Sequence, residues 1–306
     1  MKKLYIDMSC DKVNGQQHMQ RCLMNKCKEM NIYSEAEDAD ILCYVQVKPD
    51  ENLVNDWRRW KAQGKKIVFI HHYMSKSFYE RCNIFKLPGL LEELDYQIII
   101  SKESELYDYL INGRNCDPAK IAAYEQAGSE YNVLREKYFK FFPEKIEKSI
   151  MFCGKAVKGI DKFVEFTKNM SDWKRIILCP DPEKAKSDLS NYEVYNNKTF
   201  DSVYEVMSNT QFIYVPTSYK APPMHVETVV QEAIPCGTLV VVDEDFVDII
   251  KSDDFQDKGF VMKSALKYLT DKDCRTRQRR AKSFQETYFL TLSDILKKNI
   301  ETLQSI

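Results

Sequence analysis

The most regular feature of the sequence is the alternation of short apolar runs with longer amphipathic segments. β-branched and aromatic residues dominate the short runs, whereas the longer segments carry apolar residues at helical spacing. This alternation is typical of βα units that build a parallel sheet, so the fold class is predicted to be α/β. The predicted strands are Leu4–Met8, Ile41–Val47, Lys66–Ile70 and Tyr96–Ile100 in the first half, and Ile150–Cys153, Arg175–Cys179, Glu193–Tyr195, Phe212–Val215 and Thr238–Val242 in the second.

The predicted strands fall into two groups. Between the groups, residues 128–148 are rich in lysine, glutamate and aromatic residues. We therefore expect two Rossmann-like domains, residues 1–140 and 141–285. The end of the chain has a helical pattern and no further strand, so residues 286–306 are expected to form a C-terminal helix that packs back on a domain.

Composition narrows the class of protein further. The 306 residues are 44% apolar and 30% charged, as in ordinary globular proteins. The net charge is -1, from 45 basic and 46 acidic residues, so a polyanion would have to bind a local patch. Apolar runs are too short to span a membrane, and no signal-like region follows the start, so a cytoplasmic protein is expected.

The cysteines and glycines exclude several classes of site. None of the ten cysteines forms a CxxC pair or a metal-spaced cluster with histidine, which favours a reduced protein without a metal site. The nine glycines form no GxGxxG and no GxSxG motif. Gly154 and Gly159 have P-loop spacing, but Ile160 follows where Lys-Ser or Lys-Thr would be required. Dinucleotide oxidoreductases, P-loop NTPases and α/β-hydrolases are therefore disfavoured.

The first candidate site is the loop that follows the strand Ile150–Cys153. Two glycines and two lysines, Lys155 and Lys158, stand between this strand and the next helical segment. Such a loop places cations at the carboxyl edge of a sheet, where open α/β sheets bind ligands. The loop could also be a simple turn with solvated lysines. A second feature is needed to favour an anion site.

That second feature follows the strand Phe212–Val215. Residues 216–225 contain three prolines and Ser218, and they lead into a helix expected to begin near Val226. The amides at such a helix start favour a phosphate. Glu227 and Glu232 lie five residues apart, about 140° around a helix, and so do not share a face. Glu232 directly precedes a buried strand, where a carboxylate needs a partner such as ribose hydroxyls.

Residues 227–238 read Glu, four residues, Glu, three residues, Cys-Gly-Thr, and a buried strand follows. This motif resembles the nucleotide-sugar motif of retaining GT-B glycosyltransferases, most closely of the DNA α-glucosyltransferase branch of T-even bacteriophages. The Gly154 loop resembles the phosphate clamp of the same family, although Lys155 stands where arginine is usual and bidentate contacts are lost. The resemblance implies two Rossmann-like domains facing a cleft, a UDP-sugar donor and no bound cofactor or metal.

The resemblance also implies roles for individual residues. Lys155 and Lys158 would neutralise the diphosphate, and Glu232 would hold the ribose hydroxyls. The remaining residues come from three places: His71 and His72 would face the reacting centre, Glu227 would lie near the sugar or phosphates, and Gly15 and Ser218 would contact the donor.

The acceptor is the least determined part of this interpretation. The resemblance implies that glucose, or a pentose such as arabinose, is moved to a hydroxymethylated pyrimidine in double-stranded phage DNA, in the host cytoplasm. Basic residues near Trp57–Lys61 and within Arg275–Lys282 could contact DNA, but each group could equally be the solvated face of a helix. Two alternatives stay open: a GT-B transferase with a glycan or small-molecule acceptor, and an inactive GT-B-like binding protein.

Overall fold

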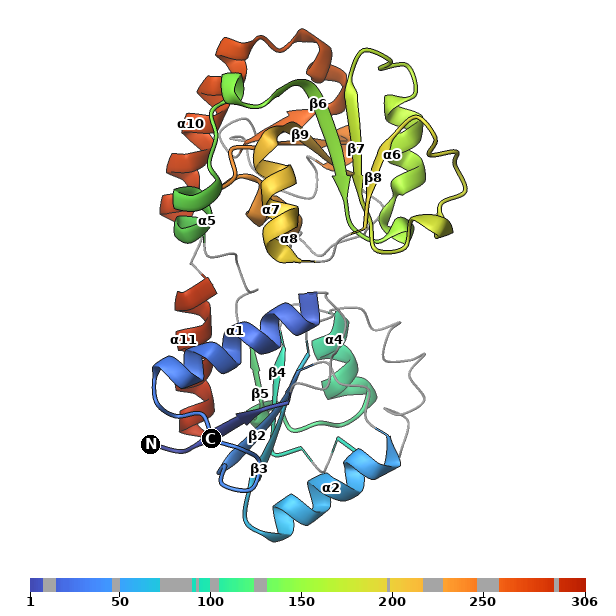
Figure 1. Cartoon of the computed structure of the whole chain (residues 1–306). Helices are drawn as coiled ribbons and strands as arrows, with labels where there is room; N and C mark the ends of the chain where they lie inside the picture. The colour runs from blue at the N-terminus through green and yellow to red at the C-terminus, as the bar shows by residue number, and fades with distance from the viewer. Residues whose placement is uncertain are drawn as a thin grey trace. The chain divides into compact units, whose positions relative to one another are not determined.

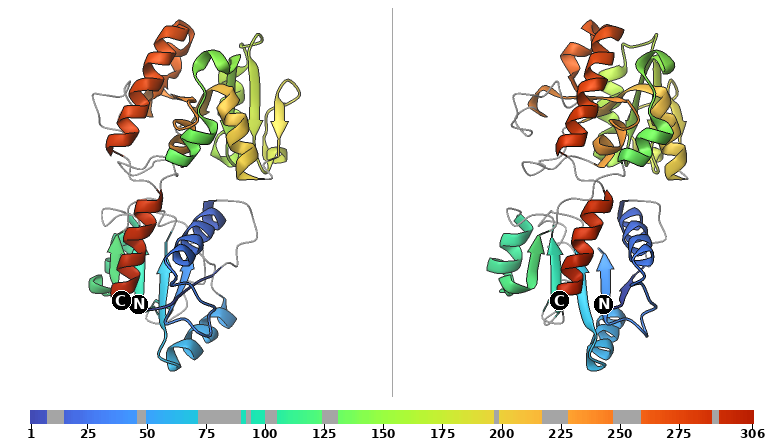
Figure 2. Two further views of the ribbon diagram at one scale, coloured as in Figure 1. Left: turned by 60° about the vertical axis from the view of Figure 1, so that its left-hand side comes forward. Right: turned by 90° about the vertical axis from the view of Figure 1, so that its left-hand side faces the viewer.

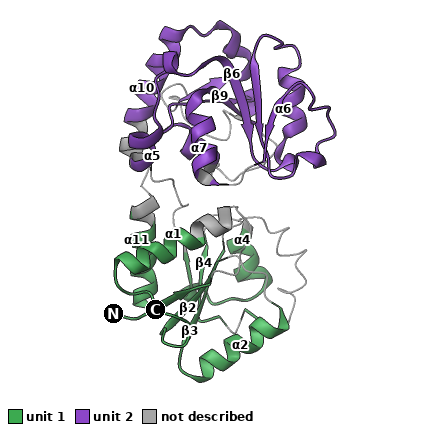
Figure 3. Ribbon diagram, in the orientation of Figure 1, with its two compact units in different colours: residues 1–127, 293–306 green, residues 128–292 purple. Residues whose placement is uncertain are grey.

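The computed structural model divides the chain into two compact units, Met1–Ala127 with Ser293–Ile306, and Gly128–Leu292 (Figure 3). Each unit is built around a parallel sheet with helices, which confirms the predicted α/β class. The structure describes residues 1–7, 15–45, 50–71, 90–91, 94–99, 105–123, 131–196, 199–216, 228–246, 259–288 and 292–306.

The sheet of the first unit has the strand order β1-β2-β3-β4-β5, and all neighbours are parallel (Figure 1). The strands are β1 (Leu4–Ile6), β2 (Ile41–Val45), β3 (Lys66–Ile70), β4 (Tyr96–Ile99) and β5 (Ile121–Ala123). Leu4 also makes a parallel bridge to Tyr33, through backbone hydrogen bonds to residues 32 and 34. After β1, the chain first pairs with one side of this strand at Tyr33 and then crosses to the other side, where it forms β2. The direction in which the strands are added therefore reverses at β1.

The helices of the first unit are α1 (Gly15–Glu29), α2 (Glu51–Ala62), α4 (Glu105–Asp108) with a π-helical turn over Tyr109–Gly113, and α11 (Leu292–Ser305). Asp50 caps α2 by accepting a hydrogen bond from the Leu53 amide at 2.9 Å. The side chain of Gln304 in α11 bonds to both the amide and the carbonyl of Lys2. The two chain ends consequently lie side by side in this unit (Figure 2).

The sheet of the second unit has the order β11-β10-β9-β6-β7-β8, again all parallel. Its strands are β6 (Ile146–Cys153), β7 (Lys174–Leu178), β8 (Glu193–Tyr195), β9 (Thr210–Val215), β10 (Leu239–Val242) and β11 (Phe260–Met262). The central strands are buried along their whole length, as expected for a sheet covered on both faces. The order reverses between β6 and β9, so these adjacent strands form the topological switch point.

Helices cover both faces of the second sheet. They are α5 (Tyr131–Tyr138), α6 (Ile160–Thr167), α7 (Phe200–Asn209), α8 (Thr228–Ala233) and α10 (Asp271–Tyr288). Phe163 of α6 packs on one face with Phe152 and Tyr214, whereas Tyr204 of α7 and Val230 of α8 pack on the other. Within the described part of the chain, no helix is both long enough and apolar enough to cross a membrane.

Candidate functional site

The candidate site lies at the carboxyl ends of β6 and β9, where the strand order of the second sheet reverses. In open α/β sheets, ligands bind at this position. The Gly154–Gly159 loop leaves β6 here, and α8 follows β9 along the chain. Three predicted site residues, His72, Ser218 and Glu227, lie outside the described residues.

Glycine geometry produces the sharp turn after β6. Gly154 has a φ of 151° and Gly159 a φ of 121°, values that other residues rarely adopt. The amide of Gly154 donates to the carbonyl of Leu178 at 3.0 Å. The amide of Ala156 donates to Asp181 Oδ1 at 2.9 Å and is therefore already occupied. The loop thus differs from a P-loop, in which backbone amides point at the phosphate, and its lysines are its main groups for an anion.

The loop lysine Lys158 and the helix carboxylate Glu232 both lie within electrostatic reach of the Cys153 thiol, at the end of β6. The pKa of Cys153 is raised to about 12, chiefly by burial; the nearby Glu232 carboxylate contributes in the same direction and Lys158 in the opposite one. Lys158 is half-buried, whereas Lys155 is exposed. The structure therefore brings the predicted cation of the loop and the predicted carboxylate of α8 to one edge of the sheet.

Glu232 is the most unusual group of the site. Its side chain is buried, with a residue exposure of 9%, and the Tyr204 hydroxyl donates to its Oε1 at 3.1 Å. Burial raises the pKa of Glu232 to about 7, and the hydrogen bond from Tyr204 opposes this shift. Among the described residues, no lysine or arginine forms an ion pair with it. A buried carboxylate of this kind is suited to accept hydrogen bonds from a ligand.

The Cys236-Gly237-Thr238 part of the motif has a structural role. Gly237 has a φ of 73°, and a Cβ at this position would collide with the carbonyl oxygen of Lys140. The hydroxyl of Thr238 donates to the carbonyl of Met207 at 2.6 Å and so ties the turn to the end of α7. These residues fix the backbone that follows α8 and thereby hold Glu232 in place.

Lys145 is a buried residue of this region that the sequence analysis did not single out. Its Nζ donates to the carbonyls of Ser208 and Cys236, at 2.6 and 3.0 Å, and reaches Thr238 Oγ1 at 3.3 Å. Burial lowers the pKa of Lys145 to about 7. The side chain joins the end of α7 to the turn after α8. No local pattern could have revealed this role, since the partners of Lys145 lie 63 to 93 residues away.

Two predicted site residues lie in the first unit. His71 follows β3, is fully buried, and its Nε2 donates to Gln97 Oε1 at 2.9 Å. Burial lowers the pKa of His71 to about 4, so the imidazole is neutral at pH 7 and can exchange hydrogen bonds without carrying charge. Gly15 begins α1, the helix that follows β1 at the switch point of this unit. The predicted contacts of both residues with a donor stay predictions.

Of the two basic groups found in the sequence, the one on α2 is largely engaged within the protein. Trp57 is fully buried, Arg59 pairs with Asp56 at 3.1 Å, and the Lys65 ammonium donates to three backbone carbonyls. This geometry favours the structural interpretation of these residues. A packed tryptophan cannot stack on a base, and an ammonium bound to carbonyls is poorly placed for phosphate.

The group on α10 is differently arranged. Arg275, Arg279 and Lys282 are exposed, and their spacing of four and three residues places them on one face of the helix. They form no ion pair with another side chain that the structure describes. Arg277, in contrast, is half-buried and donates to the Phe260 carbonyl at 3.2 Å. Arg275, Arg279 and Lys282 together are called the α10 basic face below.

Sequence comparison alone finds no counterpart. No protein-family model matches this chain, and no curated protein matches it. Likeness is found only at the level of the fold.

Solved structures of two kinds of glycosyltransferase share the fold. An alpha-glucosyltransferase in complex with UDP and a 13-mer DNA containing an HMU base aligns over 97% of both chains, with a TM-score of 0.73 and 13% identity. An alpha-glucosyltransferase with UDP-glucose and DNA containing an abasic site aligns over 92% of this chain and 84% of its own, with a TM-score of 0.68 and 14% identity. The UDP-forming alpha,alpha-trehalose-phosphate synthase from Burkholderia xenovorans, with glucose-6-phosphate, aligns over 94% and 77%, with a TM-score of 0.57 and 13% identity. The chain therefore has the GT-B fold, which it shares with alpha-glucosyltransferase and trehalose-phosphate synthase.

Proposed function

We propose that the protein is a retaining, UDP-sugar-dependent glycosyltransferase that moves glucose or arabinose to the hydroxymethyl group of a modified pyrimidine in phage DNA. The fold supports the donor class, because similar structures of other proteins contain UDP or UDP-glucose. Because these structures share little sequence with this chain, the substrates of this chain belong to the proposal.

The observation that carries the proposal is the buried carboxyl group of Glu232. It lies within electrostatic reach of the Cys153 thiol at the carboxyl end of β6, as does Lys158, and Tyr204 is its described hydrogen-bond partner. A ribose offers two adjacent hydroxyl donors, and a carboxylate can accept both. The attached diphosphate would then be neutralised by Lys155 and Lys158, since cations are favoured beside phosphate oxygens.

In the proposed reaction, the bond between the sugar C1 and the diphosphate oxygen breaks while the acceptor oxygen bonds to C1. UDP leaves with the bonding electrons, and the acceptor proton passes to a phosphate oxygen or to water. Stabilising the negative charge on the leaving diphosphate is therefore the main task of the lysines. Glu227, His71 and His72 are proposed to act near the sugar, and Gly15 and Ser218 to contact the donor.

The α10 basic face supports DNA over a small acceptor. Arg275 and Lys282 are seven residues apart, which corresponds to about 10 Å along a helix. Three outward cations over this distance can contact the DNA backbone without help from the net charge of -1.

The proposal is tested by incubating the purified protein with a panel of UDP-sugars and duplex DNA that contains cytosine, hydroxymethylcytosine or hydroxymethyluracil. The DNA is digested, the nucleosides are weighed by mass spectrometry, and released UDP is measured in parallel. We expect one base to gain a single hexose or pentose, and the Glu232→Gln variant to lose this activity. UDP release without a heavier nucleoside would contradict the DNA acceptor and favour a glycan or small acceptor. If the protein neither binds UDP nor releases it from any UDP-sugar, the proposed transferase activity is itself overturned.

A further inference from the structure

Glu232 receives its described hydrogen bond from a helix other than its own. The donor is Tyr204, in the middle of α7, and its hydroxyl lies 3.1 Å from Glu232 Oε1. Tyr204 is itself buried, with 7% exposure. The hydroxyl therefore sits in a packed environment in which it cannot readily exchange the carboxylate for water, and its position constrains the plane of the carboxyl group.

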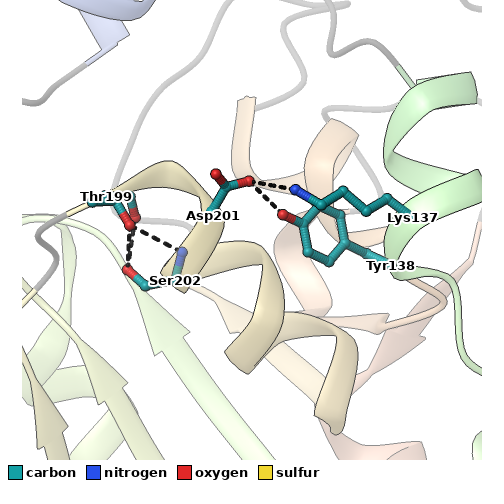
Figure 4. Close-up of polar contacts among 5 residues, drawn as sticks. All are labelled: Lys137, Tyr138, Thr199, Asp201 and Ser202. Carbon is teal, nitrogen blue, oxygen red and sulfur yellow. Dashed lines mark hydrogen bonds and ion pairs between the residues drawn. The ribbon is translucent and has the colours of Figure 1, made fainter.

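Tyr204 is in turn held by α5. Its ring lies 5.6 Å from the ring of Tyr138, centroid to centroid, with an interplanar angle of 54°. The hydroxyl of Tyr138 donates to the carboxylate of Asp201, and Lys137 pairs with the same carboxylate at 3.0 Å (Figure 4). Asp201 belongs to the first turn of α7. A continuous series of contacts thus joins α5, α7 and the carboxylate on α8.

The start of α7 is fixed independently of this series. Thr199 caps the helix by accepting a hydrogen bond from the Ser202 amide at 3.2 Å (Figure 4). The helix that carries Tyr204 is therefore anchored at its first turn by its own cap and by the contacts of Asp201. A tyrosine mounted on such a helix is a rigid support for a neighbouring side chain.

We propose that Tyr204 is a positioning residue for nucleotide binding: its hydroxyl orients the Glu232 carboxylate for the ribose hydroxyls. This inference rests on the proposed function. It adds a residue that lies outside the nucleotide-sugar motif and acts through Glu232 rather than on the nucleotide.

The groups around Glu232 determine how readily its carboxyl ionises. Burial raises the pKa of the carboxyl to about 7, and the tyrosine hydrogen bond lowers it. Lys158, on the loop after β6, acts on the neighbouring Cys153 thiol, whereas the pKa shift of Glu232 comes from burial and from Tyr204. Cys236, on the turn after α8, is kept as a thiol because burial raises its pKa to about 12. On α5, the Lys137 ammonium is paired with Asp201, and β10 presents only apolar residues.

Removing the Tyr204 hydroxyl should therefore raise the pKa of Glu232 further above 7. Ribose hydroxyls bind the ionised carboxylate best, so nucleotide affinity should rise as the pH rises through the pKa of Glu232. In a Tyr204→Phe variant, this rise should occur at a higher pH. At neutral pH the loss of affinity is expected to be about 3- to 30-fold, and it should narrow at a pH well above both pKa values, leaving only the loss of orientation.

The experiment is calorimetric titration of the full-length protein with UDP between about pH 6 and pH 9. Wild type, Tyr204→Phe and Tyr195→Phe are compared at each pH, so that the titration of the UDP phosphate cancels. Tyr195 is a matched control, because its hydroxyl bonds to the carboxylate of Glu193 at 3.0 Å on the exposed strand β8 of the same unit. We expect Tyr195→Phe to behave as wild type and Tyr204→Phe to show its largest loss near neutral pH.

A double variant separates positioning from general damage to the fold. In a Glu232→Gln background, Tyr204→Phe should change UDP affinity little, because the side chain that it orients has been replaced. The same loss of affinity in the Glu232→Gln background would overturn the positioning role. An equal loss at every pH that disappears in the Glu232→Gln background would mean that the hydroxyl orients the carboxylate without changing its ionisation. If Glu232→Gln binds UDP more weakly than wild type, but Tyr204→Phe binds it as wild type does at every pH, the proposed function stands and only the role of Tyr204 fails. If wild type does not bind UDP, the proposed function fails with it.

Discussion

A buried carboxyl group such as Glu232 lowers the stability of the nucleotide-free protein. Its ordinary pKa of 4.5 is raised to about 7 by burial, so the folded protein holds a proton that the unfolded chain releases. The stability that this proton contributes is complete below about pH 4.5 and is lost as the pH rises through about 7. Because burial of this carboxyl group lowers the folding stability at neutral and alkaline pH, its presence is better explained by binding of a ligand than by packing.

Replacing this residue should therefore stabilise the protein at alkaline pH while it weakens nucleotide binding. In Glu232→Gln, we expect the free energy of unfolding at about pH 8 to rise by about 1–3 kcal/mol, or several degrees in Tm. The gain should shrink toward about pH 5. Thermal unfolding without nucleotide at the two pH values measures it.

The control for this prediction is Glu165→Gln on α6. Glu165 pairs with Lys168 at 2.5 Å, but both side chains are more than half exposed. Its replacement should change stability by less than about 0.5 kcal/mol at either pH. A gain for Glu232→Gln that is the same at both pH values would contradict the assigned pKa.

The turn after α8 is the element on which the site depends most. Gly237 allows the backbone to turn with a φ of 73° directly beside the carbonyl of Lys140. The buried ammonium of Lys145 then binds the carbonyl of Cys236 and the carbonyl of Ser208. Local backbone freedom and a long-range hydrogen-bond donor are both needed here, because a buried carbonyl without a donor is costly.

A substitution at Gly237 should lower the stability of the fold for two reasons that can be measured separately. Gly237→Ala should lose about 1–2 kcal/mol from the positive φ and a further 1–3 kcal/mol from the collision with the Lys140 carbonyl. Gly64→Ala is the matched control: Gly64 has a φ of 81°, but a Cβ there would meet nothing within 4 Å. Hydrogen exchange of the β9 and β10 amides for Gly237, and of the β2 and β3 amides for Gly64, gives the two local free energies. Equal losses would show that the Lys140 contact is unimportant.

At the scale of the whole molecule, charge is nearly balanced, with 45 basic and 46 acidic residues. A general positive field that attracts DNA is therefore excluded, so the proposed DNA binding would require a local surface. The α10 basic face is the surface proposed for this role in the second unit. By contrast, Arg59 on α2 and Lys65, which follows this helix, are bound to groups of the first unit.

Salt dependence of DNA binding tests this surface. Replacing Arg275, Arg279 and Lys282 together by Gln should weaken binding of duplex DNA of any sequence. It should also reduce the slope of log K against log salt by up to about 3, since each phosphate contact contributes about 0.9. The binding constants are measured by fluorescence anisotropy over a range of salt concentrations.

A matched triple variant in the same unit changes Lys148, Lys168 and Lys184 to Gln. These lysines are also exposed, but each is paired with a carboxylate, at 2.6, 2.5 and 3.0 Å. This second triple variant removes the same net charge, and the slope of log K against log salt should stay near that of wild type. Equal slopes for the two triple variants would assign DNA binding to another surface.

Local signals in the sequence determined much of the fold. Apolar β-branched runs of four or more residues predicted β2, β3, β4, β6, β7, β9 and β10, because each run carries its own burial pattern. Of the three-residue strands, β1 and β8 were predicted as Leu4–Met8 and Glu193–Tyr195, whereas β5 and β11 were missed. The sequence also located the glycine turn after β6 and the carboxylate Glu232, because turn chemistry and a charge before an apolar strand are both local features. The roles of His72, Ser218 and Glu227 remain predictions.

Only the tertiary structure decided how these pieces meet. The pairing of β6 with β9, the 28-residue separation of Tyr204 from Glu232 and the contacts of Lys145 are long-range. It also joined α11 to the first unit, although α11 follows the second unit in the chain. The physical reason is the same in each case: the backbone preferences of neighbouring residues are set along the chain, whereas partners far apart in sequence are chosen by which surfaces bury together when the sheets form.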